Sequence, residues 1–590
     1  MASRLTSSFA ALPLLFTLAF EATAGEHGDE VAEARDLAGL WRARRDFGPR
    51  TRGPLTIRRD DTAWTAEIDS HRVRVAKNGD VVSFELPGER GSFLGRLEAD
   101  RSISGHWTQP ETRHGGLCYA SPVNLLPAAA DTWRGNIIPF DDTFTCFLVL
   151  QERADGSLGA FLRNPDRNWG VFAYADRVEV QGDQIHLIGE WRNRGNERVL
   201  TTGRYRDWQD SFTFNFRNAT FEFRRVEGDP VSDFYARGAN PEPWTYHAPP
   251  ALDDGWPVAT LEEVGMSEEP FREMIETVID PPARDAHTPY VHGMLVARGG
   301  KLVVEEYFHG FHRGVPHDTR SAQKSLGSFL VGAAMEAGEP VDLSMPVYET
   351  IGAPYFHDDL DERTQRMSLV HLLTMSSGLD CDDSDDNSPG NEENLQSQED
   401  NPDWYDYTLK LDTIREPGEK SVYCSINPNL AGNVLTAATG KSLETLFHDY
   451  VASPLEFSRY HLCLQPTGET YYGGGSFFLP RDFMKLGQVI MDGGTWKDHR
   501  VVSAEFAHDS IQPLTQIGER EYGYLWWVTD LDYRGSTVRA FYAGGNGGQV
   551  VMGVPELDIV ALFYAGNYSD QVMYMIQEKL VPDYVLRAIE

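Results

Sequence analysis

A proline-rich stretch in the middle of the chain divides it into two regions with different patterns, and this division constrains the fold most. Residues 229–257 include Asn240-Pro241-Glu242-Pro243 and Pro249-Pro250, and they show little apolar periodicity. Such a segment is typical of a linker. Each flank holds enough apolar residues for a core of its own, so we expect an all-β domain at 36–228 and a second domain at 258–590.

The region before the linker consists of short runs in which apolar and polar residues alternate. Phenylalanines at every second position of 212–216 predict a strand, Asn218-Ala219 allows a turn, and 221–223 resumes the alternation, which predicts a β-hairpin. The segment Gly39-Leu40-Trp41-Arg42 is weakly repeated in Asp131-Thr132-Trp133-Arg134. This repeat could arise from two related β units. It could also arise from one long meander closed into a lipocalin-like or other barrel, and a sandwich is compatible with the alternation as well.

Beyond the linker, strand and helix patterns are mixed. A predicted hairpin at 295–307 precedes a helical pattern at 321–337, and strands return at 548–554 and 558–564. Further helices are predicted around 368–375, 428–438 and 481–491. A sheet built from both ends of the segment, with helices between, is an α+β architecture.

The charge of the chain limits its partners. The sequence contains 89 acidic residues against 53 Lys and Arg, a formal net charge of -36. Phosphate backbones would be repelled, so nucleic acid is a poor candidate partner, and a small molecule is the expected one.

The first residues resemble a secretory signal. Arg4 precedes an apolar run at 9–20, and the small-residue pattern Ala22-Thr23-Ala24 follows at cleavage-site distance. The run is short for a membrane anchor, which is the alternative. We therefore expect a signal peptide at 1–24 and a mature protein, without a transmembrane segment, that is secreted or periplasmic.

The five cysteines form no C-x-x-C pair, so a zinc framework is not supported. Export would permit disulfides. One pair could join Cys118 to Cys146 and another could form among Cys381, Cys424 and Cys463, with one thiol left over, but the spacing does not fix the connectivity.

Ser321-Ala322-Gln323-Lys324 opens the helical pattern at 321–337. The Ser and the Lys are i,i+3 neighbours on the first turn, where unpaired N–H groups and the helix dipole favour a developing oxyanion. A partly desolvated Lys there could accept the proton of the Ser hydroxyl. Alone, this S-x-x-K pattern is a weak signal, because Ser is a common helix cap and Lys a common surface residue.

Six segments, taken in their order along the chain, make the S-x-x-K signal more specific than it is alone. They are Leu295–Tyr307, Ser321–Ser325, His371–Leu379, Pro417–Ser425, Tyr522–Trp527 and Gly545–Gln549. Together they resemble the serine hydrolases of the β-lactamase family, in the branch with class C β-lactamases, family VIII carboxylesterases, D-amino-acid-releasing peptidases and 6-aminohexanoate-dimer hydrolases. The resemblance spans about 261–587. It implies a β-lactamase/penicillin-binding-protein-like domain, with an antiparallel sheet, helices and a helical subdomain, and it implies no metal or organic cofactor.

The resemblance also implies catalytic roles. Ser321 would be the acylated nucleophile, Lys324 its proton acceptor, and Tyr423 of Tyr423-Cys424-Ser425 the group that passes the proton to the leaving group. Lys324 as ammonium would be expected to lower the pKa of the nearby phenol. Ser425 and Trp527 are further candidates for the substrate site, with Trp527 either a pocket wall or a packed core residue.

The third element of the family departs from its pattern. Aligning on Gly545 places Ala543-Gly544-Gly545 where the family has a Lys or His, a small residue and Gly. The N–H of Asn546, alongside that of Ser321, could still stabilise an oxyanion. Without the cation, recognition of a substrate carboxylate is in doubt, so esters or amides are expected as substrates rather than β-lactams.

An acidic segment at 380–406 lies between these motifs. It carries no Lys or Arg, so we expect a solvated loop near the rim of the site, with a calcium site as the less favoured alternative. The overall prediction is an exported serine hydrolase that cleaves an ester or amide bond. The alternative is a catalytically silent protein that binds a partner through its β-rich region, and intact Ser321, Lys324 and Tyr423 favour the enzyme.

Overall fold

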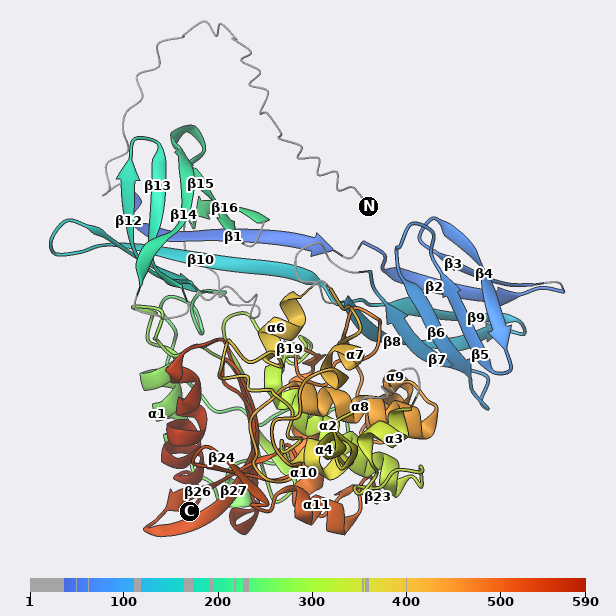
Figure 1. The fold of residues 1–590 in the computed structure, drawn as a ribbon. Coiled ribbons are helices and arrows are strands. Elements are labelled where there is room, and N and C mark those ends of the chain that lie inside the picture. Colours follow the sequence, from blue (N-terminus) through green and yellow to red (C-terminus); the bar gives the residue numbers. More distant parts are fainter. Residues whose placement is uncertain are drawn as a thin grey trace, which may run out of the picture.

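The computed structural model describes residues 37–48, 50–61, 63–110, 118–163, 173–191, 196–216, 219–226, 233–352, 355, 360–398 and 400–590. The predicted signal peptide lies outside these residues. Within them, no helix combines the length and the apolar character that a bilayer crossing requires. Figure 1 shows two β units, labelled by β12–β16 and by β2–β9, above a third unit that mixes helices and strands.

The first β unit is a closed barrel. Its strands are β1 (Gly39–Gly48), β10 (Asp142–Glu152), β11 (Leu158–Arg163), β12 (Ala173–Gln181), β13 (Gln184–Trp191), β14 (Glu197–Arg206), β15 (Ser211–Phe216) and β16 (Ala219–Arg225). β1 pairs with both β10 and β16, which closes the ring. The predicted hairpin is confirmed, because Phe212 pairs with Phe223 and Phe214 with Phe221 across β15 and β16.

The second β unit is inserted into the first, between β1 and β10. It contains β2 (Gly53–Arg59), β3 (Trp64–Ile68), β4 (His71–Asn78), β5 (Val81–Glu85), β6 (Ser92–Leu97), β7 (Ile103–Thr108), β8 (Cys118–Ala129) and β9 (Thr132–Ile137). β9 pairs with both β2 and β8, so these strands also close on themselves. The two tryptophans of the weak sequence repeat occupy different cores, with Trp41 in the first unit and Trp133 in the second.

The third unit is built on an antiparallel sheet of eight strands. Their order is β18 (Lys301–Tyr307), β17 (Val291–Arg298), β29 (Ile559–Ala565), β28 (Gln549–Val554), β27 (Ser536–Gly545), β26 (Trp527–Tyr533), β25 (Arg520–Tyr522) and β24 (Thr515–Ile517). β17 pairs with β29, so the predicted sheet from both ends of the segment is confirmed.

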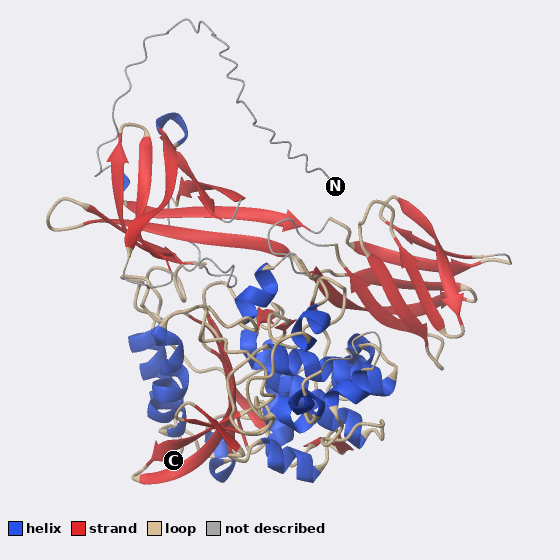
Figure 2. Cartoon of the chain, viewed as in Figure 1, coloured by secondary structure: helices blue, strands red, loops and turns tan. Residues whose placement is uncertain are grey.

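Helices cover both faces of this sheet (Figure 2). One face packs against α2 (Gln323–Glu336) and α10 (Pro480–Met491), and α8 (Ile426–Thr439) packs against α2. These three helices match predicted ones. The same side carries α3 (Val347–Ile351), α4 (Glu362–Gln365), α5 (Leu369–Leu373), α6 (Glu392–Ser397), α7 (Trp404–Leu409), α9 (Leu443–Phe447) and α11 (Ala504–Ser510). The other face packs against α1 (Glu269–Met274) and the C-terminal helical segment Ile576–Leu586. The expected α+β architecture is confirmed.

The second β unit and the third unit share a sheet and a core. Residues 118–120 of β8 pair with β20 (Tyr460–Leu464), and β20 continues through β21 (Phe477–Phe478) to β19 (His317–Asp318). Tyr119 and Phe140 pack their rings against Phe477, at centroid distances of 5.7 and 4.3 Å. The expectation of a separate core on each side of the linker therefore does not hold at this junction.

The described part of the linker, 233–257, contains no helix or strand, but it is packed onto the third unit. The indole N–H of Trp256 donates to the carbonyl of Arg481 at 2.9 Å, and the Arg481 guanidinium in turn contacts Asp254 at 2.9 Å. Proline content thus marks a segment without regular structure, although its two tryptophans, Trp244 and Trp256, are buried.

Candidate active site

Ser321 and Lys324 lie together at the start of α2. Ser321 occupies a short 3-10 turn, Arg320–Ala322, that follows β19, and α2 begins at Gln323. The Lys324 ammonium donates to Ser321 Oγ at 2.8 Å and to the carbonyl of Gly473 at 2.5 Å, and Lys324 is only 1% exposed. The i,i+3 spacing therefore brings the Ser321 and Lys324 side chains into direct contact.

Close backbone packing holds the turn that carries Ser321. Arg320 has a φ of 46°, a left-handed conformation that is strained for a residue with a side chain. A Cβ on Gly545 would clash with the Thr319 carbonyl and lie 3.0 Å from the Ala322 nitrogen. The end of β27 therefore runs beside the turn, as predicted, and a larger residue at 545 would not fit there.

A glycine segment supports the other side of the turn. A Cβ on Gly474 would lie 3.1 Å from the carbonyl carbon of Arg320 and 3.4 Å from the nitrogen of Ser321. Sequence reasoning missed this segment, although its signal was visible in Gly473-Gly474-Gly475, because a run of glycines favours close approach between backbones.

Tyr423 completes a three-residue cluster. Its phenol is hydrogen-bonded to the Ser321 side chain, and Lys324 Nζ lies 5.1 Å from the centre of its ring. Burial raises the pKa of Tyr423, while Lys324 and the bond to Ser321 lower it, and the net direction is upward. The expected net lowering is therefore wrong, because the loss of solvent outweighs the nearby cation. A phenol that keeps its proton is suited to the role of acid.

Comparison with known proteins identifies the domain that holds this cluster. Residues 284–571 match the family model described as Beta-lactamase. This segment is a beta-lactamase family domain. The matched residues include β17 to β29 and exclude both β units.

The beta-lactamase family domain has characterised relatives. A curated 6-aminohexanoate-dimer hydrolase of Paenarthrobacter ureafaciens is 26% identical over 256 residues, which cover 40% of this chain and 63% of that enzyme. The match thus spans less than two thirds of the relative. Among solved structures, unliganded simvastatin synthase from Aspergillus terreus is 18% identical and covers 54% of this chain and 96% of its own, with a TM-score of 0.41. A penicillin binding protein from Bacillus halodurans is 15% identical and covers 49% and 96%, with a TM-score of 0.39.

Trp527 packs against Tyr423. Its ring stacks on Tyr423 at 5.6 Å with an interplanar angle of 20°, and Tyr542 stacks beyond it at 6.3 Å. Trp526, in contrast, is fully buried against Phe541. Of the two tryptophans, Trp527 is thus the one that lies at the site, where it fixes the orientation of the Tyr423 ring.

Ser425 is engaged with a carboxylate that sequence reasoning did not select. Its backbone N–H and its hydroxyl both donate to Asp383 Oδ2, at 2.8 and 2.6 Å. Burial and the neighbouring Glu392 raise the pKa of Asp383, Lys324 lowers it, and the result is about 6. The acidic segment was expected to be a solvated loop. That expectation is wrong for Asp383, which is only partly exposed and lies beside the cluster.

A disulfide ties the acidic segment to the segment of Tyr423. Cys381 is bonded to Cys424, with their Cα atoms 5.8 Å apart. Cys118, Cys146 and Cys463 are thiols, so the considered pair Cys118–Cys146 is not formed. Among the described residues, one group of candidate metal ligands comes together, namely Cys381, Asp383 and Cys424, but its two sulfur atoms are bonded to each other and are not available to a metal.

At the end of β27, no cationic side chain stands at the position that carries one in the family. The residue that follows the strand, Asn546, is hydrogen-bonded to Ser569. Ala543, where the family has Lys or His, is buried. Asn546 Oδ1 accepts from the Ser569 N–H at 2.6 Å, and Asn546 Nδ2 donates to Ser569 Oγ at 3.3 Å. The side chain of Asn546 is therefore committed to Ser569, which leaves its backbone N–H as the group that can serve an oxyanion.

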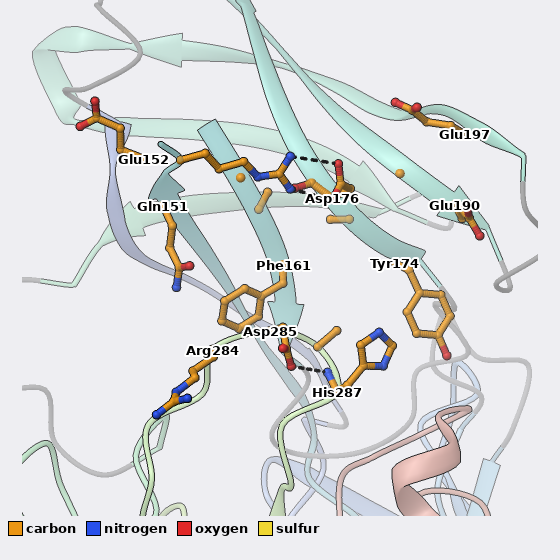
Figure 3. A pocket seen from close by; sticks show the side chains of 16 residues that line it. Gln151, Glu152, Phe161, Tyr174, Asp176, Glu190, Glu197, Arg284, Asp285 and His287 are labelled. Atoms are coloured by element: carbon orange, nitrogen blue, oxygen red, sulfur yellow. Dashed lines mark hydrogen bonds and ion pairs between the residues drawn. The ribbon is translucent and has the colours of Figure 1, made fainter. Parts of the chain in front are cut away.

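Two cavities differ in their relation to these residues. A cavity of about 20 Å³, large enough for one water molecule, adjoins Ser321 and is lined by Arg320, Glu392 and Gly474 among others. A second cavity, of about 700 Å³, lies between the first barrel and residues 284–287 (Figure 3). It contains none of the predicted site residues.

Proposed function

We propose that the chain is a serine hydrolase that cleaves an ester or amide bond of a small molecule through an acyl-enzyme on Ser321. The observation that carries this proposal is the mutual contact of Ser321, Lys324 and Tyr423 in a beta-lactamase family domain. The name of the curated relative, a hydrolase, supports the reaction class.

The geometry supports the following sequence of proton transfers. Lys324, when neutral, accepts the hydroxyl proton of Ser321 as Oγ attacks the carbonyl carbon. The N–H groups of Ser321 and Asn546 stabilise the oxyanion. Tyr423 then donates its proton to the departing oxygen or nitrogen, and Lys324 restores that proton. Water attacks the acyl-enzyme by the same steps in reverse, which releases the acid and frees Ser321.

The substrate class follows from the absent cation. Because Ala543 offers no positive charge, the strand beside Ser321 does not supply the group that holds a substrate carboxylate elsewhere in the family. A short-chain p-nitrophenyl ester should therefore be hydrolysed far better than a penicillin or cephalosporin. Comparable rates on both would show that another cation takes this role.

The test of the proposed function uses a fluorophosphonate probe and a short-chain p-nitrophenyl ester. The wild type should be labelled and active, whereas Ser321→Ala should lose labelling and at least about 10³-fold of the ester activity. The exposed Ser384 provides a control, and Ser384→Ala should retain both properties. An unlabelled, inactive wild type would favour the silent binding protein, and a labelled Ser321→Ala would place the nucleophile elsewhere.

We also propose that the protein is exported and processed near Ala24. The basic residue, apolar run and small residues at 1–24 support this, and the Cys381–Cys424 disulfide is of the kind that persists in oxidising compartments. The amino-terminal sequence of the protein from its source should begin shortly after Ala24. Recovery of the uncleaved protein from the cytoplasm would contradict the proposal.

A further inference from the structure

The first barrel contacts the loop 566–570, which follows β29 and holds Asn546. On β12, the hydroxyl of Tyr174 donates to the backbone carbonyl of Ser569. The N–H of Ser569 donates to Asn546 Oδ1 at 2.6 Å, and Ser569 Oγ accepts from Asn546 Nδ2 at 3.3 Å. Ser569 therefore connects a side chain of the first barrel with the residue that follows β27.

The backbone of Ser569 has a conformation that needs support from its neighbours. Its φ is 59°, in the left-handed region, which is unfavourable for a residue with a side chain and persists only when the surrounding structure holds it. The start of the loop is fixed by the N–H of Asn567, which donates to the carbonyl of Gly547 at 3.1 Å. Ser569 lies two residues further along, where it is held by Tyr174 and Asn546.

A second set of contacts joins the first barrel to the same loop. His287 Nδ1 lies 2.5 Å from Oδ2 of the buried Asp570, and the His287 ring faces that of Tyr174, with centroids 6.2 Å apart and an interplanar angle of 19° (Figure 3). Arg163, on β11, donates to the carbonyl of Thr288 at 2.7 Å. Burial and Asp570 raise the pKa of Tyr174 to about 12, so its hydroxyl keeps the proton that it donates.

The position of the Asn546 N–H relative to Ser321 depends on this loop. Gly545, the last residue of β27, packs against the turn that carries Ser321. Asn546 comes directly after it, and its side chain is bonded to Ser569. Stabilisation of an oxyanion depends on the exact placement of its donors, so a small shift of the loop would weaken the contribution of this N–H.

We propose that Tyr174 of the first barrel is a positioning residue, which holds the Asn546 N–H in place for the oxyanion through its hydrogen bond to Ser569. This inference rests on the proposed function, because it takes the oxyanion donor from that reaction. Tyr174 acts through Ser569 and not on the substrate. The first barrel, which lies outside the matched residues 284–571, would thereby contribute to the chemistry at Ser321.

The test compares Tyr174→Phe with the wild type in the hydrolysis of p-nitrophenyl acetate. The change removes one hydroxyl and keeps the ring that faces His287. Complete loss of an oxyanion donor lowers kcat by about 10²–10³-fold, and a displaced donor should cost less, so we expect kcat to fall about 10-fold while KM changes by less than about twofold. Phenylboronic acid, which forms a tetrahedral adduct with a serine hydroxyl, should bind more weakly by a similar factor, because the adduct engages the same N–H groups.

A double-mutant cycle separates this role from a general contribution to stability. Asn546→Ala keeps the backbone N–H but loses both hydrogen bonds to Ser569, so kcat should fall at least as far as in Tyr174→Phe. In that background Tyr174→Phe should cause no further loss, because the two changes break the same series of contacts. Tyr205→Phe is the matched control: the Tyr205 hydroxyl also makes one hydrogen bond within the first barrel, to Asp210 at 2.9 Å, and its loss should leave kcat and the affinity for phenylboronic acid unchanged.

The outcomes distinguish this inference from the proposed function. If the wild type is neither labelled at Ser321 nor active on the ester, the proposed function fails, and the inference fails with it. If the wild type is active but Tyr174→Phe matches it in kcat and in affinity for phenylboronic acid, only the role of Tyr174 is overturned. Losses that multiply in the double variant would also overturn it, because Tyr174 would then act independently of Asn546.

A second variant tests the same contacts if Tyr174→Phe does not fold. Ser569→Ala removes the hydroxyl that accepts from Asn546 Nδ2 and leaves the Ser569 carbonyl for Tyr174. It should lower kcat and the affinity for phenylboronic acid, with no further loss when it is combined with Asn546→Ala. Wild-type values in Ser569→Ala and in Asn546→Ala would overturn the proposal.

Discussion

The disulfide between Cys381 and Cys424 is predicted to stabilise the catalytic domain and to keep Tyr423 in place. The two cysteines are buried and 43 residues apart in sequence. Closing a loop of this length lowers the entropy of the unfolded chain by an amount that corresponds to about 4 kcal/mol at 25 °C. For a domain of this size, that loss should lower the melting temperature by roughly 5 °C.

The disulfide is removed in two ways. One is the double variant Cys381→Ala/Cys424→Ala, and the other is the wild type in reducing buffer. Thermal unfolding followed by calorimetry gives the melting temperature of the catalytic domain, and fluorophosphonate labelling gives the rate at Ser321. Both samples should have a lower melting temperature and a lower rate of labelling at Ser321, because the bond holds together the two segments that carry Asp383 and Tyr423. Cys146→Ala, in the first barrel, is the control and should leave labelling unchanged.

An unchanged melting temperature would show that the loop is restrained equally well without the bond. An unchanged labelling rate in a destabilised variant would show that the bond stabilises the domain but does not determine the position of Tyr423. The second result would show that the disulfide does not keep Tyr423 in place.

Four further predictions concern the catalytic residues, the domain junction and Asp383. Lys324→Ala should reduce the rate of labelling by about 10³-fold or more, as labelling rates would measure. Tyr423→Phe should reduce the hydrolysis of alkyl esters more than that of p-nitrophenyl esters, because the p-nitrophenolate leaving group needs no proton, and steady-state rates on both esters would measure this. A fragment of residues 251–590 should be insoluble or markedly destabilised, because it loses the strand that pairs with β20, and expression with calorimetry would show this. The pKa of Asp383, about 6 against 3.8 in the unfolded chain, means that its contribution to stability is present below pH 3.8 and lost as the pH rises through 6. The stability of Asp383→Asn relative to wild type should therefore improve by about 3 kcal/mol between pH 3.5 and pH 8, as urea unfolding would measure.

Local patterns allowed the sequence to predict elements and motifs. The alternating phenylalanines of 212–216 and 221–223 form the expected pair of strands, because each strand buries one face. The contact of Ser321 with Lys324 follows from one helical turn, so it also needed no long-range information.

Pairing between distant strands and the burial of individual side chains could not be predicted from local patterns. The insertion of β2–β9 between β1 and β10 has no local signature, since each strand alternates in the same way whichever neighbour it pairs with. Asp383 looks like its acidic neighbours in sequence, and only the fold brings it to Ser425 and Lys324. The pKa of Tyr423 was mispredicted because the proximity of a cation could be inferred, whereas the extent of desolvation could not.

The proposed mechanism requires that an acyl group is transferred to Ser321. Mixing the enzyme with p-nitrophenyl acetate, stopping the reaction in acid within the first turnover and mapping the peptides by mass spectrometry tests this directly. We expect one acetyl group on the peptide that contains Ser321, and none on that peptide in Ser321→Ala. Ester hydrolysis by the wild type with the acetyl group on another residue, or with no acylated peptide at any time, would contradict it.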